Sequence, residues 1–387
     1  MKLLIQPDAG VAPLLAAIKN AKKSVEIAIF RFDRKDVEVA LKAAASAKKV
    51  GVTAVIAFAN RGGEQNLRKL ELRFLDAGII VARSANDLIR YHAKYILIDR
   101  RVLHVLSFNF TKLDIDHSRG FGIITTNKNW VREAARLFEA DASRTNYVPA
   151  QKTDTFVVSP TNSRKVLSSF LRGAKSQLLI YDPKISDPEM LRILHERAKA
   201  GVEIKIIGSV GKRGALDVQK LAGRRLHTRT IIRDRQQAFV GSQSLRTAEL
   251  DFRRELGLIV RDGKAVSKLI ETFESDWTPT GSKATKSKAT KDTDLSGAAA
   301  DAADAADDAR AGVSVADQKK AVKVLNKELS PLAVTVKKAV RNAVAKVGDD
   351  VLSDKGVKDT MKKVVKKAVK EAVKEAVQEA ETAKNNA

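Results

Sequence analysis

Short apolar runs alternate with longer amphipathic segments from the N-terminus to about position 280 of the chain. Apolar runs of strand length lie at 25–30, 52–58, 78–81, 102–106 and 122–126. Segments with the length and spacing of helices lie between and after them, at 37–47, 65–76 and 130–142. This alternation predicts an α/β fold of mixed sheets with helices on their faces.

The later part of this region repeats the earlier part. The sequence AKKS at 21–24, which precedes a strand, matches GAKS at 173–176, and KKVGV at 48–52 matches KAGV at 199–202. The helical segment between these points recurs at 188–199. Two similar halves, residues 1–150 and 151–279, predict a pseudo-twofold arrangement in which related residues meet near the axis.

Beyond residue 280 the pattern changes. Residues 281–311 contain Ser-Lys-Ala-Thr-Lys repeats and a run of only alanine and aspartate at 300–308. We therefore expect a disordered linker over 280–313. Residues 314–387 are rich in lysine, alanine and valine, and predict a helical tail. Such a tail suits oligomerisation through its helices or binding to an acidic surface, and the sequence leaves both open.

The chain is strongly basic. It has 71 Lys+Arg against 46 Asp+Glu, a formal net charge of +25, and residues 1–280 hold 49 and 30 of these. The excess in the predicted folded part favours a polyanionic partner, either nucleic acid or an anionic membrane surface. There is no cysteine, and no apolar run approaches the ~18 residues of a membrane span. We expect a cytoplasmic protein that can bind at the membrane periphery.

One stretch in the first half, YHAKYILID at 91–99, has an apolar strand pattern with polar residues at both ends. His92 and Lys94 are two residues apart, so on a strand they face the same side. A histidine and a lysine that project together can attack phosphorus and bind a phosphate anion. With Asp99 the spacing is H-x-K-x-x-x-x-D, which alone arises easily by chance.

A second copy gives this pattern its weight. HTRTIIRD at 227–234 supplies His227, Arg229 and Asp234 in the same spacing, with arginine in place of lysine. Each copy is followed by an apolar strand and a serine-containing step, Ser107 with Asn109 in the first half and Ser242 with Ser244 in the second. Each copy of the motif thus offers one histidine and one cation.

The doubled motif resembles the phospholipase D superfamily, whose signature is a repeated HxKxxxxD followed by a GSxN-like step. The resemblance covers roughly residues 1–278. It implies a pseudo-twofold phospholipase D-like fold and an enzyme that cleaves phosphodiesters through a phosphohistidine, with no metal and no cofactor. The sequence also lacks a cysteine or histidine cluster of the kind that binds a metal.

The resemblance also implies roles for the motif residues. His92 would be the nucleophile, and His227 would protonate the leaving group and then activate water or an alcohol. Lys94 and Arg229 would bind the non-bridging oxygens. The other motif residues fall into two groups: Asn109 and Ser244 would add hydrogen bonds to the phosphate, while Asp99, Asp234, Ser107 and Ser242 would support the motif strands.

A carboxylate that orients a histidine is the remaining part of such a site. Glu255 follows His227 in the segment RRELG at 253–257, where the family carries this carboxylate. In family members it can serve the histidine of the other half, so Glu255 would orient His92. The matching first-half position is Gly120, which leaves Asp114 or Asp116 as candidates for His227.

Three departures from the family pattern affect the functional prediction. Arg229 replaces the family lysine, Ser244 replaces asparagine, and Leu106 replaces the glycine before Ser107. We predict a phospholipase D-type hydrolase or transferase acting on phospholipids. A nuclease acting on DNA or RNA and a catalytically degenerate scaffold that binds anions are the alternatives. Only four tyrosines and two tryptophans are present, which gives few platforms for base stacking.

Overall fold

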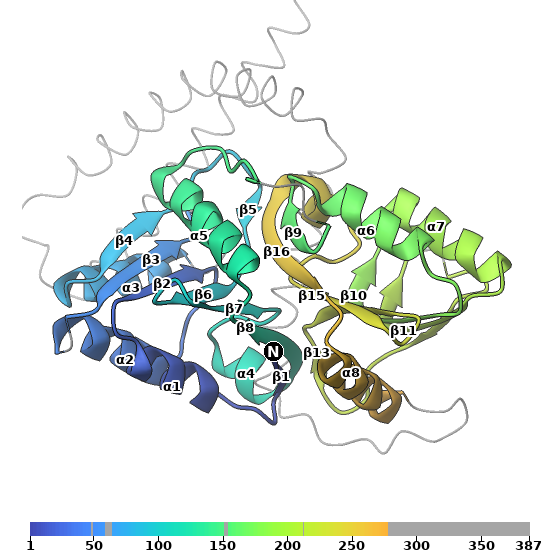
Figure 1. The fold of residues 1–387 in the computed structure, drawn as a ribbon, viewed down its shortest axis with the longest axis horizontal. Coiled ribbons are helices and arrows are strands. Elements are labelled where there is room, and N and C mark those ends of the chain that lie inside the picture. The colour runs from blue at the N-terminus through green and yellow to red at the C-terminus, as the bar shows by residue number, and fades with distance from the viewer. Residues whose placement is uncertain (48, 59–63, 151–153, 212, 278–387) are drawn as a thin grey trace, which may run out of the picture. The chain divides into compact units, whose positions relative to one another are not determined.

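The computed structural model describes residues 1–277 apart from 48, 59–63, 151–153 and 212 (Figure 1). All of the described residues belong to one unit. The expected linker at 280–313 and the expected helical tail at 314–387 lie outside the described residues. Among the helices of the described ranges, none has the length and hydropathy needed to cross a membrane.

The first half is built on a mixed sheet. Its strands in order across the sheet are β1 (Lys2–Gln6), β8 (Ser118–Thr125), β7 (Val102–Leu106), β6 (Tyr95–Ile98), β2 (Ser24–Ile29), β3 (Gly51–Ile56) and β4 (Ile80–Arg83). The β2–β3 and β3–β4 pairs are parallel, and the other four pairs are antiparallel. The predicted strand at 78–81 begins two residues later, because Gly78 adopts a positive φ of 76° in the turn before it.

The second half repeats this strand order in a second sheet. Its strands are β12 (Asp217–Gln219), β11 (Glu203–Val210), β10 (Gln177–Ile185), β14 (Arg229–Arg233), β15 (Gln237–Gly241), β16 (Arg253–Val260) and β9 (Phe156–Ser159), which pairs with β16. Here too the pairs on one side of the central strand, β10–β11 and β11–β12, are parallel. The predicted pair of similar mixed-sheet halves is confirmed.

Helices cover the sheets, which explains why both faces of the central strands are apolar. They are α1 (Ala12–Asn20), α2 (Lys35–Ser46), α3 (Glu64–Asp76), α4 (Lys112–Asp116), α5 (Lys128–Ser143), α6 (Ser163–Arg172), α7 (Pro188–Lys199), the π-helix η1 (Ala248–Phe252) and α8 (Gly263–Asp276). Helix α7 begins as its sequence predicts. Asp187 accepts hydrogen bonds from the Glu189 and Met190 N–H groups, and proline takes the first helical position.

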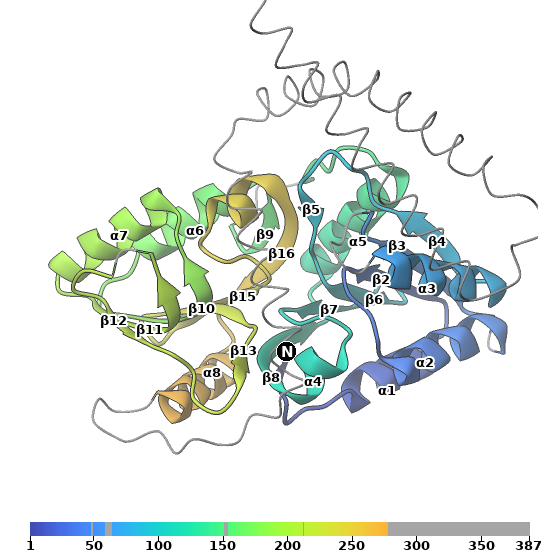
Figure 2. The same ribbon diagram turned by 180° about the vertical axis from the view of Figure 1, so that it is seen from behind.

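Each half lends a two-residue strand to the sheet of the other (Figures 1 and 2). Strand β5 (Arg90–Tyr91) of the first half pairs with β16, and β13 (Arg225–Leu226) of the second half pairs with β8. Because each short strand comes directly before a motif histidine, the exchange carries both histidines to the junction of the halves. There the His92 N–H donates to the Arg254 carbonyl at 2.8 Å, and the His227 N–H donates to the Arg119 carbonyl at 3.1 Å.

The junction is a packed core. One hydrophobic cluster contains buried residues of both halves, including Phe121 and Tyr181, whose rings meet edge to face at 5.4 Å between centroids. Arg119 forms an ion pair with Asp276 at 2.7 Å, and the Tyr181 hydroxyl donates to the same carboxylate at 2.8 Å. Apolar burial with satisfied polar groups fixes the two halves against each other.

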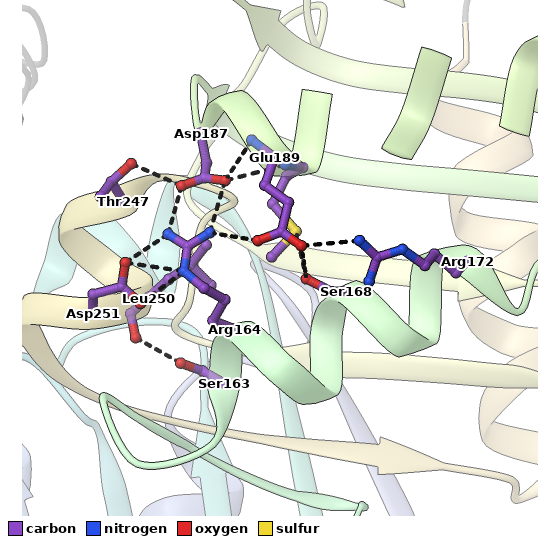
Figure 3. A network of polar contacts seen from close by, with 10 residues as sticks. Ser163, Arg164, Ser168, Arg172, Asp187, Glu189, Thr247, Leu250 and Asp251 are labelled. Carbon is purple, nitrogen blue, oxygen red and sulfur yellow. Dashed lines mark hydrogen bonds and ion pairs between the residues drawn. The ribbon is translucent and has the colours of Figure 1, made fainter. Parts of the chain in front are cut away.

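A charged network holds the π-helix η1 in place (Figure 3). Arg164 of α6 binds Asp187 at the start of α7 at 2.7 Å, and it also contacts Asp251 of η1. The first half has a similar device, in which Arg34 binds Asp36 of α2 and Asp116 of α4. In both halves an arginine therefore ties the segment after the motif to the second helix.

Candidate active site

His92 and Lys94 lie at the junction, between β5 and the start of β6. Both are almost fully buried, with 5% and 0% of their surface exposed. The Lys94 carbonyl accepts from the Leu106 N–H at 2.9 Å, which continues the β6–β7 ladder to the motif. The His92 ring packs edge-on against Phe30 at 4.5 Å between centroids. The backbone and this ring together fix the direction of the imidazole.

The carboxylate that faces His92 comes from the other half. Nδ1 of His92 lies 2.8 and 2.9 Å from the two carboxylate oxygens of Glu255 in β16. The pair is buried, so burial holds the pKa of His92 well below its usual range and raises the pKa of Glu255 to about 8. The structure thus brings together two residues, His92 and Glu255, that are far apart in the sequence.

Asp114 is the acid that approaches His227. Its Oδ2 lies 3.5 Å from Nδ1 of His227, while its Oδ1 accepts from Arg225 at 2.7 Å. The Asn109 backbone and side-chain N–H groups also donate to Asp114, at 2.9 and 2.6 Å. Burial alone would raise the pKa of Asp114, but the facing cations and these donors lower it far below its usual range. The other candidate, Asp116, is paired with Arg34 instead.

Lys94 and Arg229 are the two motif cations of the site. Among the described residues, Nζ of Lys94 and Nε of Arg229 have no hydrogen-bond partner. The Arg229 guanidinium donates from Nη1 to the His227 carbonyl at 3.0 Å. After burial, the charges of both Lys94 and Arg229 contribute to lowering the pKa of each motif histidine. Both histidines therefore lie within electrostatic reach of the same two cations.

Asn109 and Ser244, at the same repeat position, have different surroundings. The Asn109 amide N–H donates to Asp114, and its Oδ1 has no hydrogen-bond partner among the described residues. The Ser244 hydroxyl donates to the Asp182 carboxylate. A hydroxyl has one hydrogen, so Ser244 would have to release Asp182 before it could donate to a phosphate. Its predicted phosphate contact stays a prediction.

Asp99 and Asp234 lie at the ends of the motif strands away from the histidines. Asp99 accepts from the N–H groups at the start of β2, including that of Lys23 at 2.6 Å, and Asp234 accepts equivalently at the start of β10, from the Ser176 N–H at 2.8 Å. These backbone donors hold the pKa of each carboxyl below its usual range, against the opposing effect of partial burial. Both aspartates tie a motif turn to the central strand.

Ser107 and Ser242 likewise join neighbouring strands. The Ser107 hydroxyl accepts from the Phe121 N–H at 2.9 Å, and the Ser242 hydroxyl accepts from the Leu256 N–H at 3.2 Å. Because Phe121 follows position 120 and Leu256 follows Glu255, the two serines fix the strand segments next to these repeat-related positions.

Sequence reasoning missed three charged residues of the site: Glu249, Arg253 and Asp182. All three are buried. Glu249 accepts from the Ser244 N–H at 2.6 Å and from Arg253 at 3.0 Å. A signal for Glu249 existed, because the sequence offset between the two motif histidines is also the offset between Asp114 and Glu249. No comparable signal marked Asp182.

The arrangement suits attack on a phosphate ester. One imidazole has a carboxyl group at Nδ1, which can leave Nε2 free as a nucleophile. Burial lowers the pKa of the second imidazole, His227, well below its usual range, and the charge of the ionised Asp114 carboxylate opposes this effect. The N–H groups of Lys94 Nζ and Arg229 Nε, which make no hydrogen bond to any described residue, lie within electrostatic reach of both imidazoles. Within the described residues, there is no group of three or more acidic or histidine side chains arranged to hold a metal ion.

Comparison with known proteins gives a family match and similar folds. The family described as cardiolipin synthase, PLD-like domain, matches residues 14–142 and 167–277. Polyphosphate kinase from Porphyromonas gingivalis has 20% identity and a TM-score of 0.60 over 74% of this chain, which spans 53% of that enzyme's length. Phosphatidylserine synthase from Haemophilus influenzae has 10% identity and a TM-score of 0.55, covering 71% of this chain and 85% of its own. Nuc from Salmonella typhimurium, a phospholipase D family member, has 22% identity and a TM-score of 0.34, covering 38% and 97%.

Proposed function

Because this chain belongs to the family of cardiolipin synthase, PLD-like domains, we propose that it is a metal-independent phosphodiesterase of the phospholipase D type. The observation that carries the proposal is the His92–Glu255 contact across the two halves, at 2.8 Å, together with the Lys94 side-chain nitrogen, which has no hydrogen-bond partner within the described part of the chain. Such a contact between distant segments supplies an oriented nucleophile next to an anion-binding cation.

In the first step, ionised Glu255 accepts from Nδ1–H of His92, so that Nε2 carries the lone pair. Nε2 attacks phosphorus, a P–N bond forms, and the P–O bond to the leaving group breaks. His227 gives its proton to the departing oxygen. Lys94 and Arg229 donate to the non-bridging oxygens.

In the second step, His227 acts as a base. It takes a proton from water or from an acceptor alcohol, whose oxygen then attacks phosphorus and displaces Nε2 of His92. Hydrolysis results with water and phosphatidyl transfer with an alcohol. The ionised carboxylate of Asp114 supports this role, because a negative charge near Nδ1 favours the imidazolium form of His227.

We propose phospholipids as the substrate class. The description of the matching family supports this choice, and the positive charge of residues 1–280 suits an anionic bilayer surface. The same charge also suits a nucleic acid, and a nuclease is therefore the second candidate. A catalytically degenerate scaffold is the third candidate. It is supported by the Ser244 hydroxyl, which already donates its hydrogen bond to Asp182 and so does not donate one to a phosphate.

The test is an assay of the purified full-length chain against vesicles of phosphatidylglycerol or phosphatidylcholine, against DNA, and against bis(p-nitrophenyl) phosphate, each with and without EDTA. We expect release of the lipid headgroup that EDTA does not reduce. His92→Ala should abolish it, while His117→Ala, which changes an exposed histidine, should not. Cleavage of DNA alone would favour the nuclease. Binding of anions without turnover of any substrate would favour the scaffold.

A further inference from the structure

Asp114 and Glu249 occupy the same position in the two halves, since the offset between them equals that between the motif histidines. Each is held by the same backbone contact. Asp114 accepts from the Asn109 N–H at 2.9 Å, and Glu249 accepts from the Ser244 N–H at 2.6 Å. Their positions in the fold are therefore equivalent, and a difference in what they contact reflects a difference in task.

The charged contacts of the two acids differ. Asp114 approaches His227 and Arg225, whereas Glu249 contacts arginines at each of its oxygens. Oε1 of Glu249 lies 3.0 Å from Nη1 of Arg253 and 3.6 Å from Nη1 of Arg246, and Oε2 lies 3.8 Å from Nε of Arg229. Glu249 is not needed beside the first-half histidine, because another carboxyl group already occupies Nδ1 of that ring.

The geometry favours a fixed arginine pair. The Ser244 N–H binds Oε2 of Glu249 and so restrains rotation of the carboxylate, which leaves Oε1 directed at Arg253. Arg253 is fully buried and lies two residues before Glu255 on β16, so both side chains point to the same face of the strand. The charge of Arg253 also acts on the pKa values of His92 and Glu255, which places it within electrostatic reach of the nucleophile.

We propose that Glu249 is a positioning residue that holds Arg253 and Arg229 as a clamp for the substrate phosphate, and that Arg253 is an additional phosphate-binding residue. This inference rests on the proposed function, since it adds to the same site. The repeated motif accounts for Lys94 and Arg229 only. Arg253 adds a planar group with several donors, which binds two phosphate oxygens at once more readily than an ammonium group does.

The substitution Glu249→Asp tests the positioning role, because it keeps the charge and shortens the side chain by one methylene group. If Glu249 fixes the clamp, this change should weaken the binding of inorganic phosphate to the full-length chain about tenfold, measured by calorimetry at one pH. If Glu249 only balances charge, the affinity should stay unchanged, and the inference is overturned. Glu26→Asp is the matched control, because Glu26 is a buried acid that pairs with Arg100 at 2.6 Å.

Arg253→Lys provides the second test, which is needed if circular dichroism shows that the Glu249→Asp variant does not fold. It keeps one positive charge and loses the planar donor pair, so phosphate affinity should fall while the melting temperature stays close to that of the wild type. Unchanged affinity would exclude Arg253 from the clamp. Because phosphate binding needs no turnover, the proposed function can fail while this inference stands. Conversely, if the chain turns over diesters but both variants bind phosphate as tightly as the wild type, the clamp is refuted and the proposed function stands.

Discussion

Glu255→Gln separates the charge of this carboxyl group from its size. In the wild type, Glu255 is fully buried against His92, and its pKa is about 8 compared with 4.5 for an ordinary glutamate. The folded chain therefore binds this proton more tightly than the unfolded chain does. Glutamine has the same shape and titrates nowhere in this range, so the difference between the two proteins isolates the Glu255 proton.

The sign of the stability effect follows from linkage. A carboxyl whose pKa is raised by folding contributes its full stability below the unfolded pKa, and this contribution is lost as the pH rises through the folded pKa. Each pH unit in this window corresponds to about 1.4 kcal/mol, so the wild type loses on the order of 5 kcal/mol across it relative to the variant. Glu255→Gln should thus gain stability relative to wild type as the pH rises from 4.5 to about 8.

Urea unfolding of both proteins at several pH values within this window measures the effect. The free energy of unfolding of the variant minus that of the wild type should increase with pH. A difference that is constant across the window would refute the reasoning, because it would mean that Glu255 has the same proton affinity in the folded and unfolded chains. The m-value of each protein serves as a control for a change in the unfolded state.

The Glu255 carboxyl group should also govern how turnover depends on pH. Only ionised Glu255 can accept from Nδ1–H of His92 and leave Nε2 free, so turnover in the wild type should rise with pH towards about 8. Glutamine can present its amide N–H to Nδ1 and stabilise the wrong tautomer, as in asparagine variants of the serine-protease triad. We expect a loss of about 100- to 10,000-fold in kcat. A wild-type profile without a rise in this range would contradict the assignment.

Three further predictions concern the other parts of the chain. His92→Ala should abolish turnover of all substrates, whereas His227→Ala should retain turnover of p-nitrophenyl diesters. Mass spectrometry of the His227→Ala variant should show a phosphoryl group on the peptide that contains His92. An adduct on His227 in the wild type would reverse the roles. Asp114→Asn should slow the turnover of substrates with poor leaving groups more than that of p-nitrophenyl diesters. It should also shift the part of the pH–rate profile that reports protonated His227 to lower pH, because the neighbouring negative charge is gone. An unshifted profile would mean that Asp114 does not affect the proton of His227. Removal of residues 281–387 should leave turnover of bis(p-nitrophenyl) phosphate unchanged and reduce only the activity on vesicles. If the truncated chain loses both activities, part of the site lies in the removed segment.

The repeat was the strongest information in the sequence. It predicted two similar halves, and the alternation of apolar segments predicted elements such as β7 and α7 with the bounds that the structure shows. It did not predict the exchanged strands β5 and β13. Each is two residues long, too short for a period-two pattern, and each is defined only by pairing with the other half.

The charged interior of the site was harder to predict. His92, Lys94 and their second-half counterparts stand out because the motif spacing repeats. Glu249 and Arg253 lie in the segment AELDFRR at 248–254, where charged and apolar residues are mixed, and both side chains are fully buried. Charged residues are buried only where partners exist, and those partners come from segments distant in sequence.

The asymmetry between the two histidines has a steric origin in the first half. A carboxylate at position 120 would mirror Glu255, but a Cβ there would lie 3.0 Å from Cδ1 of Phe108 and 3.2 Å from its Cβ. Phe108 corresponds to Gln243 in the other half, so an aromatic side chain occupies the space that the mirrored carboxylate would need. The acid for His227 therefore comes from Asp114, where cations and amide donors keep it ionised, whereas Glu255 is held by burial near its neutral form. A twofold frame with two unlike carboxyl groups gives the two histidines different electrostatic surroundings before any substrate binds, which suits the proposed division into one histidine that attacks and one that carries a proton.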